Sequence, residues 1–482
     1  MKPFHILIVG SNPLLVRNLW DRVAARGDFR ISHLVHPSYD CRTWPQNLRA
    51  NDVHFFREDI RTPNPPADFD FLASLERGRV PTIHNMIMSD RLTAKLPYDD
   101  VIAYAGLLAK RLVMLYEATN PSVVIGAFDG LHSSLGLAVA NYLRMPWFAL
   151  LFSPLPGGEA AFCEDLSPAS RVVFEEHRAA SLRTKAERLL TEFEARKLAA
   201  VAYIPPKLFS AAFMFKQVPA QFGAFVRVLR RRRLKEFLRF TDYPQTYSFR
   251  GLVGEAFRHR KNLYLLRRRK LMNVPVQTRF VFFGLHMQPE SSIDVFAHFF
   301  SNQERVVELI ARSVPPTHSV LVKLHKSDSS NYSPNQLARL ARFPGVKLVS
   351  PYADTVEFIK NADLIFAIQG TIGLEGALLG KPVIMFGDSP VKVFPSVSTF
   401  EKTIELPALV RRKLAEHSPG RSEILAGFAA YLAPFYPASG NDWSLKPTDA
   451  QVADYVRLIE LLRVHGKGEN ARLRAPESPW TM

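Results

Sequence analysis

The sequence of 482 residues predicts an α/β protein with two doubly wound, Rossmann-like domains and a basic helical insertion between them. Short apolar runs alternate with segments of helical period toward both ends of the chain, and the chain is too long for one ordinary core. The middle looks helical and is rich in arginine. We expect a first domain at residues 1–158, the insertion at 159–275, a second domain at 276–445, a closing helix at 446–466 and a frayed tail at 467–482.

The first domain begins with an apolar run that we interpret as a buried strand and not as a signal peptide, because no small-residue cleavage site accompanies it. Strand-like and helix-like segments then alternate, which is typical of a parallel sheet with helices on both faces. The expected strands are 5–9, 31–35, 122–127 and 146–152, and the expected helices are 14–26, 100–118 and 132–144.

The second domain shows the clearer alternation. Its strands are continuous apolar runs, as expected for strands that are covered on both faces. The expected strands are 279–285, 319–325, 346–350, 362–368 and 382–387, and the expected helices are 301–313, 334–342, a short one after Asp354, and 371–379.

The net charge of +17 implies an anionic partner, such as a phosphate-bearing ligand, a nucleic acid or an acidic membrane surface. Residues 227–270 alone carry fifteen Lys and Arg against three acids, so they supply +12 of this charge. Cys41 and Cys163 lie far apart and exclude a disulfide framework, which fits a reducing compartment. No apolar stretch reaches the roughly 18 residues that span a bilayer. We therefore expect a cytoplasmic protein.

Ligands of doubly wound sheets bind in the loops that follow the carboxyl ends of the strands. One such loop precedes the expected helix at 371–379. Gly370 would let the backbone turn tightly, and Thr371 would cap the helix, whose first amides would face an anion such as a diphosphate. Glu375 lies about one turn further on, where a carboxylate suits the hydroxyl pair of a ribose or a sugar. The alternative is a structural helix with a solvated Glu375.

A second candidate loop follows the first strand of the second domain. It holds His286, Gln288 and Glu290, and Ser291 or Ser292 could cap the next helix. A histidine here could donate to a phosphate oxygen or act as an acid or base. The alternative is a plain turn with a surface glutamate.

A third loop concentrates positive charge beside the same expected crevice, through Lys323, His325 and Lys326. The spacing of His286 and His325 matches no compact metal motif, so we expect a diphosphate here, no metal and no bound cofactor. A lysine pair on a solvated loop is the alternative.

In the first domain, Asp129 and His132 follow the strand at 122–127, where the chain turns into an apolar helix. Asp129 could be a general base for an attacking hydroxyl, or both residues could be cap and first-turn residues of a structural helix. The turn at 9–12 is not a GxGxxG fingerprint, which disfavours a dinucleotide site. The sequence assigns no role to three further residues, His84, Asp90 and Arg91.

The motifs "FFGLHMQPESS", "VKLH" and "GTIGLEGALLGKPV", set in two parallel-sheet domains, resemble GT-B glycosyltransferases. More narrowly, they are similar to bacterial capsule and surface-polysaccharide transferases, a group that includes Kdo transferases. The likeness is specific over roughly residues 279–390 and architectural elsewhere. It implies an activated sugar donor in the C-terminal domain, an acceptor on the N-terminal domain and reaction in the cleft between them.

The resemblance implies a metal-independent transfer, in which a helix dipole with Lys and His side chains offsets the charge of the leaving group. This sequence departs from the family's pattern at two places. The family's His-Pro pair reads His325-Lys326 here, and the E-x7-E pattern of many retaining enzymes is absent around Glu375. The implied catalytic residues are Asp129, His132 and Glu290, and the implied donor-binding residues are His286, Gln288, Lys323, His325, Gly370, Thr371 and Glu375.

Residues 209–270 set aromatic and aliphatic side chains beside an arginine block. On an anionic membrane each Lys or Arg contributes about 1 kcal/mol, so this segment could hold the protein at the inner face of the cytoplasmic membrane. That location would suit a surface-polysaccharide or lipid-linked glycan acceptor. The alternative is a solvated helical insertion.

Other functions stay open at this point. A sugar-nucleotide epimerase shares the two-domain fold, and a catalytically inactive scaffold could have it too. The basic segment alone would also fit a non-catalytic protein that binds nucleic acid or membrane. No helix-turn-helix, zinc finger or RNA-recognition pattern is present, so we expect no specific nucleic acid as partner.

Overall fold

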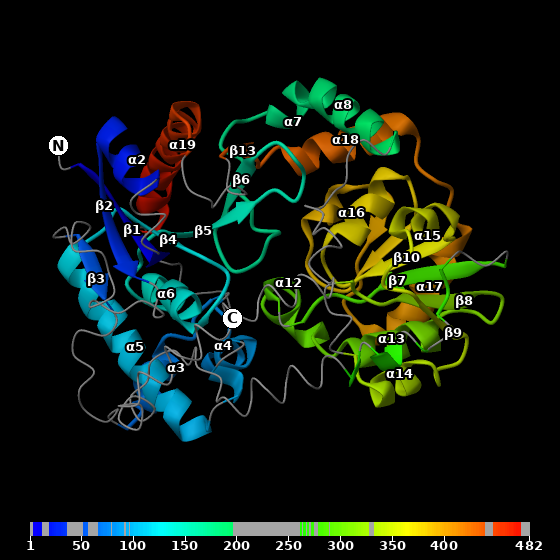
Figure 1. The fold of residues 1–482 in the computed structure, drawn as a ribbon. Coiled ribbons are helices and arrows are strands. Elements are labelled where there is room, and N and C mark those ends of the chain that lie inside the picture. Colours follow the sequence, from blue (N-terminus) through cyan, green and yellow to red (C-terminus); the bar gives the residue numbers. More distant parts are fainter. Residues whose placement is uncertain are drawn as a thin grey trace. The chain divides into compact units, whose positions relative to one another are not determined.

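The fold comes from a computed structural model, and its helices and strands are labelled in Figure 1. Most of the basic segment at 209–270, with the membrane-binding surface expected there, lies outside the described residues, as do Cys41 and Arg91. The structure describes residues 3–11, 19–35, 52–55, 66–78, 80–90, 93–95, 97–195, 261–262, 264–266, 268, 271–273, 278–288, 290–326, 332–438 and 447–465, and the backbone of 466–473.

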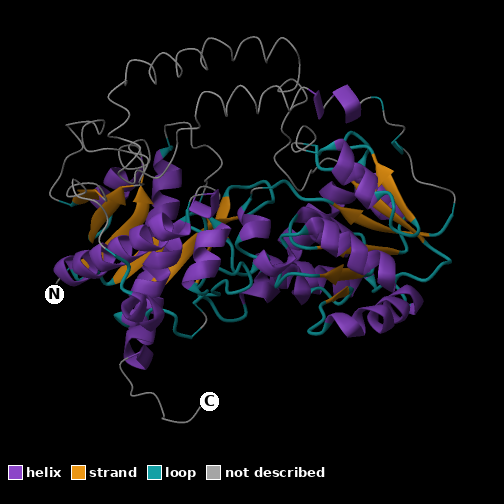
Figure 2. Ribbon diagram, turned by 90° about the horizontal axis from the view of Figure 1, so that it is seen from below, coloured by secondary structure: helices purple, strands orange, loops and turns teal. Residues whose placement is uncertain are grey.

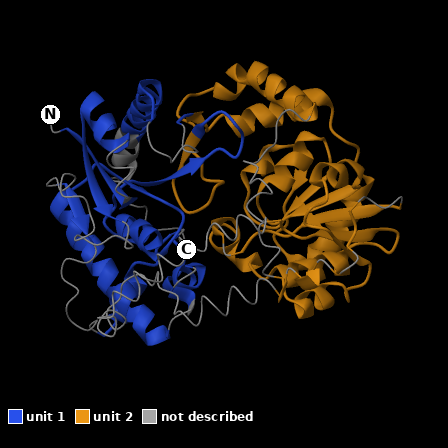
Figure 3. Ribbon diagram, in the orientation of Figure 1, with its two compact units in different colours: residues 1–159, 201–252, 437–482 blue, residues 160–200, 253–436 orange. Residues whose placement is uncertain are grey.

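The chain divides into two compact units, which are coloured separately in Figure 3. Unit 1 contains the described residues up to Glu159 and those from Pro437 onward. Unit 2 contains the described residues of 160–200 and 253–436, so part of the segment expected as an insertion belongs to the same unit as the second sheet. Figure 2 shows that each unit combines strands with helices packed beside them.

The first sheet has seven strands in the order β13-β6-β5-β4-β1-β2-β3. The pairs among β1 to β5 that are adjacent in this order are all parallel, which confirms the predicted parallel sheet. The division between the units falls within β6. The strands are β1 (Phe4–Ser11), β2 (Phe29–Val35), β3 (Val53–Phe55), β4 (Val123–Gly126), β5 (Trp147–Phe152), β6 (Glu159–Cys163) and β13 (Tyr436–Pro437).

Helices cover both faces of this sheet. Figure 1 shows α2 and α19 on one side and α5 and α6 on the other, and α6 packs on β1, β4 and β5. The long helix α5 has two acids in its first turn and ends at Asn120, which adopts a left-handed conformation with φ of 41°. The helices of unit 1 are α2 (Asp21–Arg26), α3 (Phe69–Ser74), α4 (Ile83–Ser89), the 3-10 turn η3 (Thr93–Lys95), α5 (Tyr98–Thr119), α6 (Leu131–Tyr142) and α19 (Asp449–Leu473).

The second sheet has six strands in the order β12-β11-β10-β7-β8-β9, and every pair in it is parallel. The five strands expected in the second domain are all present. They are β7 (Phe280–Gly284), β8 (Ser319–Lys323), β9 (Val346–Val349), β10 (Leu364–Ala367) and β11 (Val383–Met385), joined by the short β12 (Val397–Ser398).

Alternate residues of these strands face opposite helix layers. On one face, the buried side chains of Val322 and Phe283 share a core with α13, α14 and α17. On the other face, Phe282 stacks on Phe358 of α15 with ring centroids 5.6 Å apart, and α16 packs on β10 and β11. The predicted doubly wound architecture is therefore confirmed.

The helices of unit 2 agree with the expected ones and add several that the sequence analysis did not anticipate. They are α7 (Arg178–Ser181), α8 (Arg183–Glu194), α12 (Ser291–Asp294), η5 (His298–Phe300), α13 (Gln303–Ser313), α14 (Pro334–Leu340), α15 (Thr355–Asn361), α16 (Thr371–Leu378), η6 (Pro390–Val393), η7 (Thr403–Glu405), α17 (Leu406–Ala415) and α18 (Arg421–Leu432).

Two differences from the expected elements have simple causes. The segment 159–275 was expected to be helical, yet β6 is a strand; its sequence "EAAFC" has little β-branched character to reveal it. Of the helix expected at 14–26, the structure describes a π-helical turn at Leu19 and Trp20 followed by α2, and residues 12–18 lie outside the described part. Among the described helices, none is both long and apolar enough to cross a membrane.

Candidate active site

The candidate site lies at the carboxyl ends of β7, β8 and β10, which are neighbours in the second sheet. In the register of β7 and β8, Gly284 is opposite Lys323, and the amide of Leu285 donates to the carbonyl of Lys323 over 2.9 Å. His286 and His325 therefore leave the sheet side by side. The loop that follows β10 turns at Gly370.

Gly370 occupies a conformation that favours glycine, with φ of 82° and ψ of −169°. A Cβ atom at this position would lie 3.1 Å from Cε1 of His286, so the imidazole packs directly on the glycine. The tight turn expected at Gly370 is confirmed. The packing brings the loop after β7 into contact with the turn that starts α16.

The expected cap at Thr371 is wrong. Gly370 is the N-cap residue of α16, and Thr371 is already the first residue of the helix. An N-cap side chain must belong to a residue outside the helical conformation, so Thr371 starts one position too late to cap. No side chain among the described residues caps α16, and its first-turn amides keep their capacity to bind an acceptor.

Glu375 is buried at 9% exposure, which excludes the alternative of a solvated surface glutamate. Two glycines flank Glu375 in α16 and pack closely on the sheet. A Cβ on Gly373 would lie 2.6 Å from Sδ of Met385, and one on Gly376 would lie 2.6 Å from Cδ1 of Ile365. The helix therefore lies close against β10 and β11, and Glu375 of this helix is near enough to Lys323 for their charges to interact.

Lys323 and Glu375 are both buried, and each influences the pKa of the other electrostatically. Burial lowers the pKa of Lys323 to about 8, helped by Lys326 and opposed by Glu375 and Asp354. Burial also raises the pKa of Glu375 to about 7, with Lys323 acting against the increase. The ammonium group of Lys323 donates to the carbonyl of Pro351 over 3.1 Å. Both side chains thus change protonation closer to neutral pH than they would in water.

The two imidazoles are neutral at pH 7. The pKa of His286 is lowered to about 3, mainly by burial and further by the neighbouring His325. The pKa of His325 is lowered to about 4, mainly by burial and further by Lys323. Nε2 of His286 and Nδ1 of His325 are buried and have no hydrogen-bond partner among the described residues. A neutral imidazole offers one donor and one acceptor, so these nitrogens can meet phosphate or hydroxyl oxygens of a ligand.

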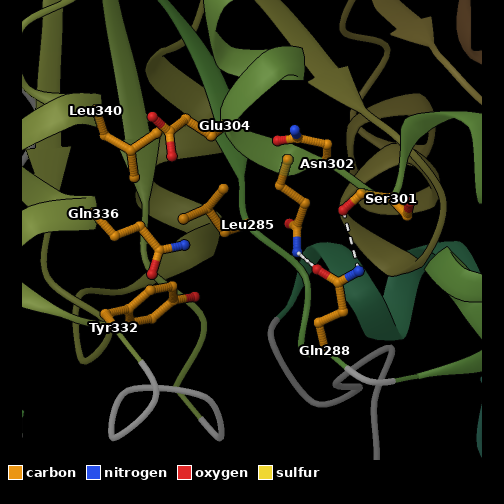
Figure 4. Close-up of a pocket in the computed structure, with 9 residues that line it drawn as sticks. Leu285, Gln288, Ser301, Asn302, Glu304, Tyr332, Gln336 and Leu340 are labelled. Atoms are coloured by element: carbon orange, nitrogen blue, oxygen red, sulfur yellow. Dashed lines mark hydrogen bonds between the residues drawn. The ribbon is translucent and has the colours of Figure 1, made fainter. Parts of the chain in front are cut away.

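The loop after β7 is held by a network of side chains. Gln288 donates to Oδ1 of Asp294 over 2.8 Å and to the carbonyl of Ser301 over 3.1 Å, and it accepts from Gln303. Figure 4 shows the bond from Gln288 to Ser301 at the wall of a cavity of about 280 Å³. The amide of Gln288 is thus occupied in the loop, and its role toward a donor remains a prediction.

Glu290 is the N-cap residue of α12, and its Oε2 accepts from the hydroxyl of Ser292 over 2.8 Å. The expected capping by Ser291 or Ser292 is wrong, because Ser291 and Ser292 are the first two residues inside this short helix. The amide of Glu290 donates to Asp294 over 3.0 Å. The structure therefore ties Glu290 into the same loop as His286.

In unit 1, Asp129 is exposed in the loop after β4, and Gly130, with φ of 89°, is the N-cap residue of α6. Asp129 is therefore not the cap, which corrects that alternative. His132 lies in the first turn, as the alternative expected, and is 2% exposed. A Cβ on Gly10 would lie 3.1 Å from its Nε2, so His132 packs against the end of β1.

Asp90, which had no assigned role, stabilises the start of α6. Its carboxylate accepts from the amide of Leu131 over 2.7 Å and from the amide of Thr93 over 2.9 Å. The sequence carries no local signal for this contact, because Asp90 and Leu131 are 41 positions apart. His84, which also had no role, hydrogen-bonds to the hydroxyl of Tyr98 over 2.8 Å.

No protein-family model matches this sequence, and no curated protein matches it. Among solved structures, the chain is similar to the β-Kdo 2,7 transferase KpsC of Thermosulfurimonas dismutans, at 10% identity and a TM-score of 0.33, over 73% of this chain and 89% of that one.

It is also similar to UDP-GlcNAc 2-epimerase of Methanocaldococcus jannaschii in complex with UDP-GlcNAc and UDP, at 13% identity and a TM-score of 0.29, over 89% of this chain and 97% of that one. A third likeness is to the glycotransferase of kitacinnamycin, at 15% identity and a TM-score of 0.29, over 95% and 99% of the two chains. Likenesses at identities and scores this low do not establish the function of this chain.

Proposed function

We propose that this protein is a glycosyltransferase that takes a sugar from a nucleotide-activated donor bound at the carboxyl edge of the second sheet. The observation that carries the proposal is the cluster around Gly370. An uncapped helix start, two neutral imidazoles, a buried lysine and a buried glutamate lie where three neighbouring strands end. Sites of this kind in doubly wound sheets suit a diphosphate with a polyhydroxylated group beside it.

In the proposed reaction an acceptor hydroxyl attacks the anomeric carbon, the bond from that carbon to the diphosphate oxygen breaks, and the acceptor proton passes to a base. Negative charge develops on the diphosphate in the transition state, and stabilising this charge is the main way in which the protein can lower the activation barrier. The first-turn amides of α16, the ammonium of Lys323 and N–H groups of His286 and His325 would stabilise it. These donors are held before the reaction begins, so little reorganisation is needed.

Glu375 would accept hydrogen bonds from hydroxyls of the donor. Above its pKa of about 7, Glu375 carries a buried carboxylate that is suited to this, because hydrogen bonds to a charged acceptor are stronger than those between neutral groups. Asp129 of unit 1 is the proposed base, with His132 next, and Glu290 is the proposed acid–base residue of unit 2. These three assignments come from the strand-end positions and the family resemblance.

Nucleotide binding tests the donor site. Unfolding is measured for the wild-type protein with UDP, GDP, dTDP, CDP and CMP, since a ligand at about 100 times its dissociation constant stabilises a protein by about 2.7 kcal/mol. We expect one base to stabilise the protein, and the effect to be lost in Glu375→Ala but kept in Glu401→Ala, an exposed glutamate of the same unit. Absence of stabilisation by all five nucleotides would overturn the proposal.

Nucleotide release separates transfer from epimerisation. With sugar donors that carry the nucleotide identified in the first experiment, a transferase releases nucleotide only when an acceptor glycan is added. An epimerase would instead convert that sugar nucleotide without acceptor and keep the nucleotide attached. Formation of a stereoisomeric sugar nucleotide in the absence of acceptor would therefore contradict the transferase.

The proposed acceptor is a surface polysaccharide or a lipid-linked glycan, reached from the cytoplasmic face of the membrane through residues 209–270. The support is the charge of this segment in the sequence. Sedimentation with vesicles of anionic or zwitterionic lipid tests it. Binding to anionic vesicles alone, weakened by salt, is expected, and equal recovery with both lipids would remove the membrane from the proposal.

A further inference from the structure

Gln303, the first residue of α13, hydrogen-bonds to both backbone groups of His286. Its Oε1 accepts from the amide of His286 over 2.7 Å, and its Nε2 donates to the carbonyl of His286 over 3.1 Å. The same Nε2 donates to Oε1 of Gln288 over 3.1 Å. One carboxamide therefore uses its acceptor and both of its donor hydrogens on the loop after β7.

These bonds begin where the sheet ends. The last ladder bond from β7 to β8 runs from the amide of Leu285 to the carbonyl of Lys323, and the next amide, that of His286, already turns to Gln303. The side chain of Gln303 thus acts as a neighbouring strand would for one more residue. A backbone fixed at both its N–H and its C=O has little freedom left to move the side chain that it carries.

We propose that Gln303 is a positioning residue that holds the imidazole of His286 against Gly370, at the turn beside which the donor diphosphate would bind. The proposal rests on the proposed function for the identity of the ligand, and on the structure for the contact itself. The hydrogen bonds of Gln303 to His286 go to its backbone. Gln303 acts through the backbone, and the ring in turn has only the space that Gly370 leaves, at 3.1 Å from a Cβ position.

The chemistry of the side chain makes the proposal specific. Gln303→Glu keeps the length and the acceptor for the amide of His286, but it removes both donated bonds and places a carboxylate against two carbonyl oxygens. Gln303→Leu removes all three bonds at similar volume. Both changes should free the loop, because a buried carbonyl left without a donor favours a conformation in which water reaches it.

A matched control lies in the same cavity wall. Gln336 is labelled in Figure 4 among the residues that line the cavity, and its side chain forms no hydrogen bond with the described residues. Gln336→Leu therefore makes the same chemical change next to the same space without touching His286.

The test observes the imidazole directly, by NMR of full-length protein labelled with ¹³C at histidine, with the His286 signal assigned from a His286→Ala spectrum. In the wild type and in Gln336→Leu, we expect no titration of His286 from about pH 5 to about pH 8, because its pKa is about 3. In Gln303→Leu and Gln303→Glu we expect its pKa to rise toward about 6.5, the value of a solvated histidine.

The second readout is the affinity for the nucleotide that stabilises the wild-type protein in the binding experiment. Gln303→Leu should weaken nucleotide binding about as much as His286→Ala does, by about tenfold or more. The variant that combines both substitutions should bind no more weakly than either single variant, because both act through the same imidazole. An unchanged His286 titration in both folded Gln303 variants overturns the positioning role whatever the nucleotide results. A changed titration in a protein that binds no nucleotide supports the positioning role and overturns the proposed function instead.

Discussion

Replacing Gly370 by alanine tests whether the turn before α16 is as tight as the structure shows. With φ of 82° and ψ of −169°, the residue lies in a region that only glycine adopts readily, and forcing another residue there costs about 1–3 kcal/mol. The added Cβ would also meet Cε1 of His286 at 3.1 Å, so the ring has to give way by a few tenths of an ångström. Both effects act on folding, and the second also acts on the site.

Gly345→Ala is the matched control. Gly345 belongs to the same unit and has φ of 74°, but a Cβ there meets only the carbonyl oxygen of His318, at an ordinary 3.8 Å. Substitution should cost about 1–2 kcal/mol for the left-handed backbone alone. The stabilisation that alanine brings by restricting the unfolded chain is common to both variants and cancels in the comparison.

Urea unfolding of both variants and nucleotide titration by calorimetry measure the difference. We expect Gly370→Ala to lose more stability than Gly345→Ala by about 1 kcal/mol, and to lose nucleotide affinity while Gly345→Ala keeps it. Equal stabilities, together with equal affinities, would refute the reasoning. Lost stability with unchanged affinity would show that the turn is tight but that His286 has no part in binding.

Three further predictions concern buried charges. The pKa of Glu375 is about 7 in the folded protein and about 4.5 in the unfolded chain, so the stability that it contributes is complete below about pH 4.5 and is lost as pH rises through about 7. The free energy of unfolding of Glu375→Gln, measured in urea across this range, should lack that decline. Parallel pH dependences of the free energy in the variant and the wild type would contradict the prediction. Lys323→Met should weaken nucleotide diphosphate binding by about tenfold or more, which calorimetry would detect, whereas an unchanged affinity would remove the ammonium from the site. Asp90→Ala should destabilise unit 1 by about 1–3 kcal/mol in urea, because the amides of Leu131 and Thr93 lose their acceptor, while nucleotide affinity should stay unchanged. A loss no larger than that of Asp28→Ala, at an exposed aspartate of the same unit, would contradict the capping role.

The strands of the second sheet could be predicted because each is a continuous apolar run that both helix layers bury. The placement of His286, Lys323, His325 and Gly370 at one edge followed from the same runs, since parallel strands end on the same side. Errors of one residue, as at Thr371, arise because a cap depends on where the backbone leaves the helical conformation. A run of residue types does not specify that point.

The supports of the site could not be predicted from local patterns. Gln303 lies 17 positions from His286 and Asp90 lies 41 positions from Leu131, so each contact exists only after the sheet and its helices have assembled. The close approach of α16 to β10 and β11 is likewise a tertiary contact. The glycines that permit it are visible in the sequence, but the surfaces that they meet are not.

The alternation of β8 explains why one edge of the sheet can serve both packing and chemistry. Val320, Val322 and Leu324 enter the core with α13 and α14, so Lys323 and His325 face the opposite layer, where α16 carries Glu375. Buried Lys and Glu side chains in that layer are a poor source of stability, because removing charges from water is costly unless they are closely paired. Hydrophobic residues at both positions would pack there at lower cost. The shifted pKa values of Lys323 and Glu375, at the strand ends where ligands bind in this architecture, therefore favour a role in binding over a role in folding.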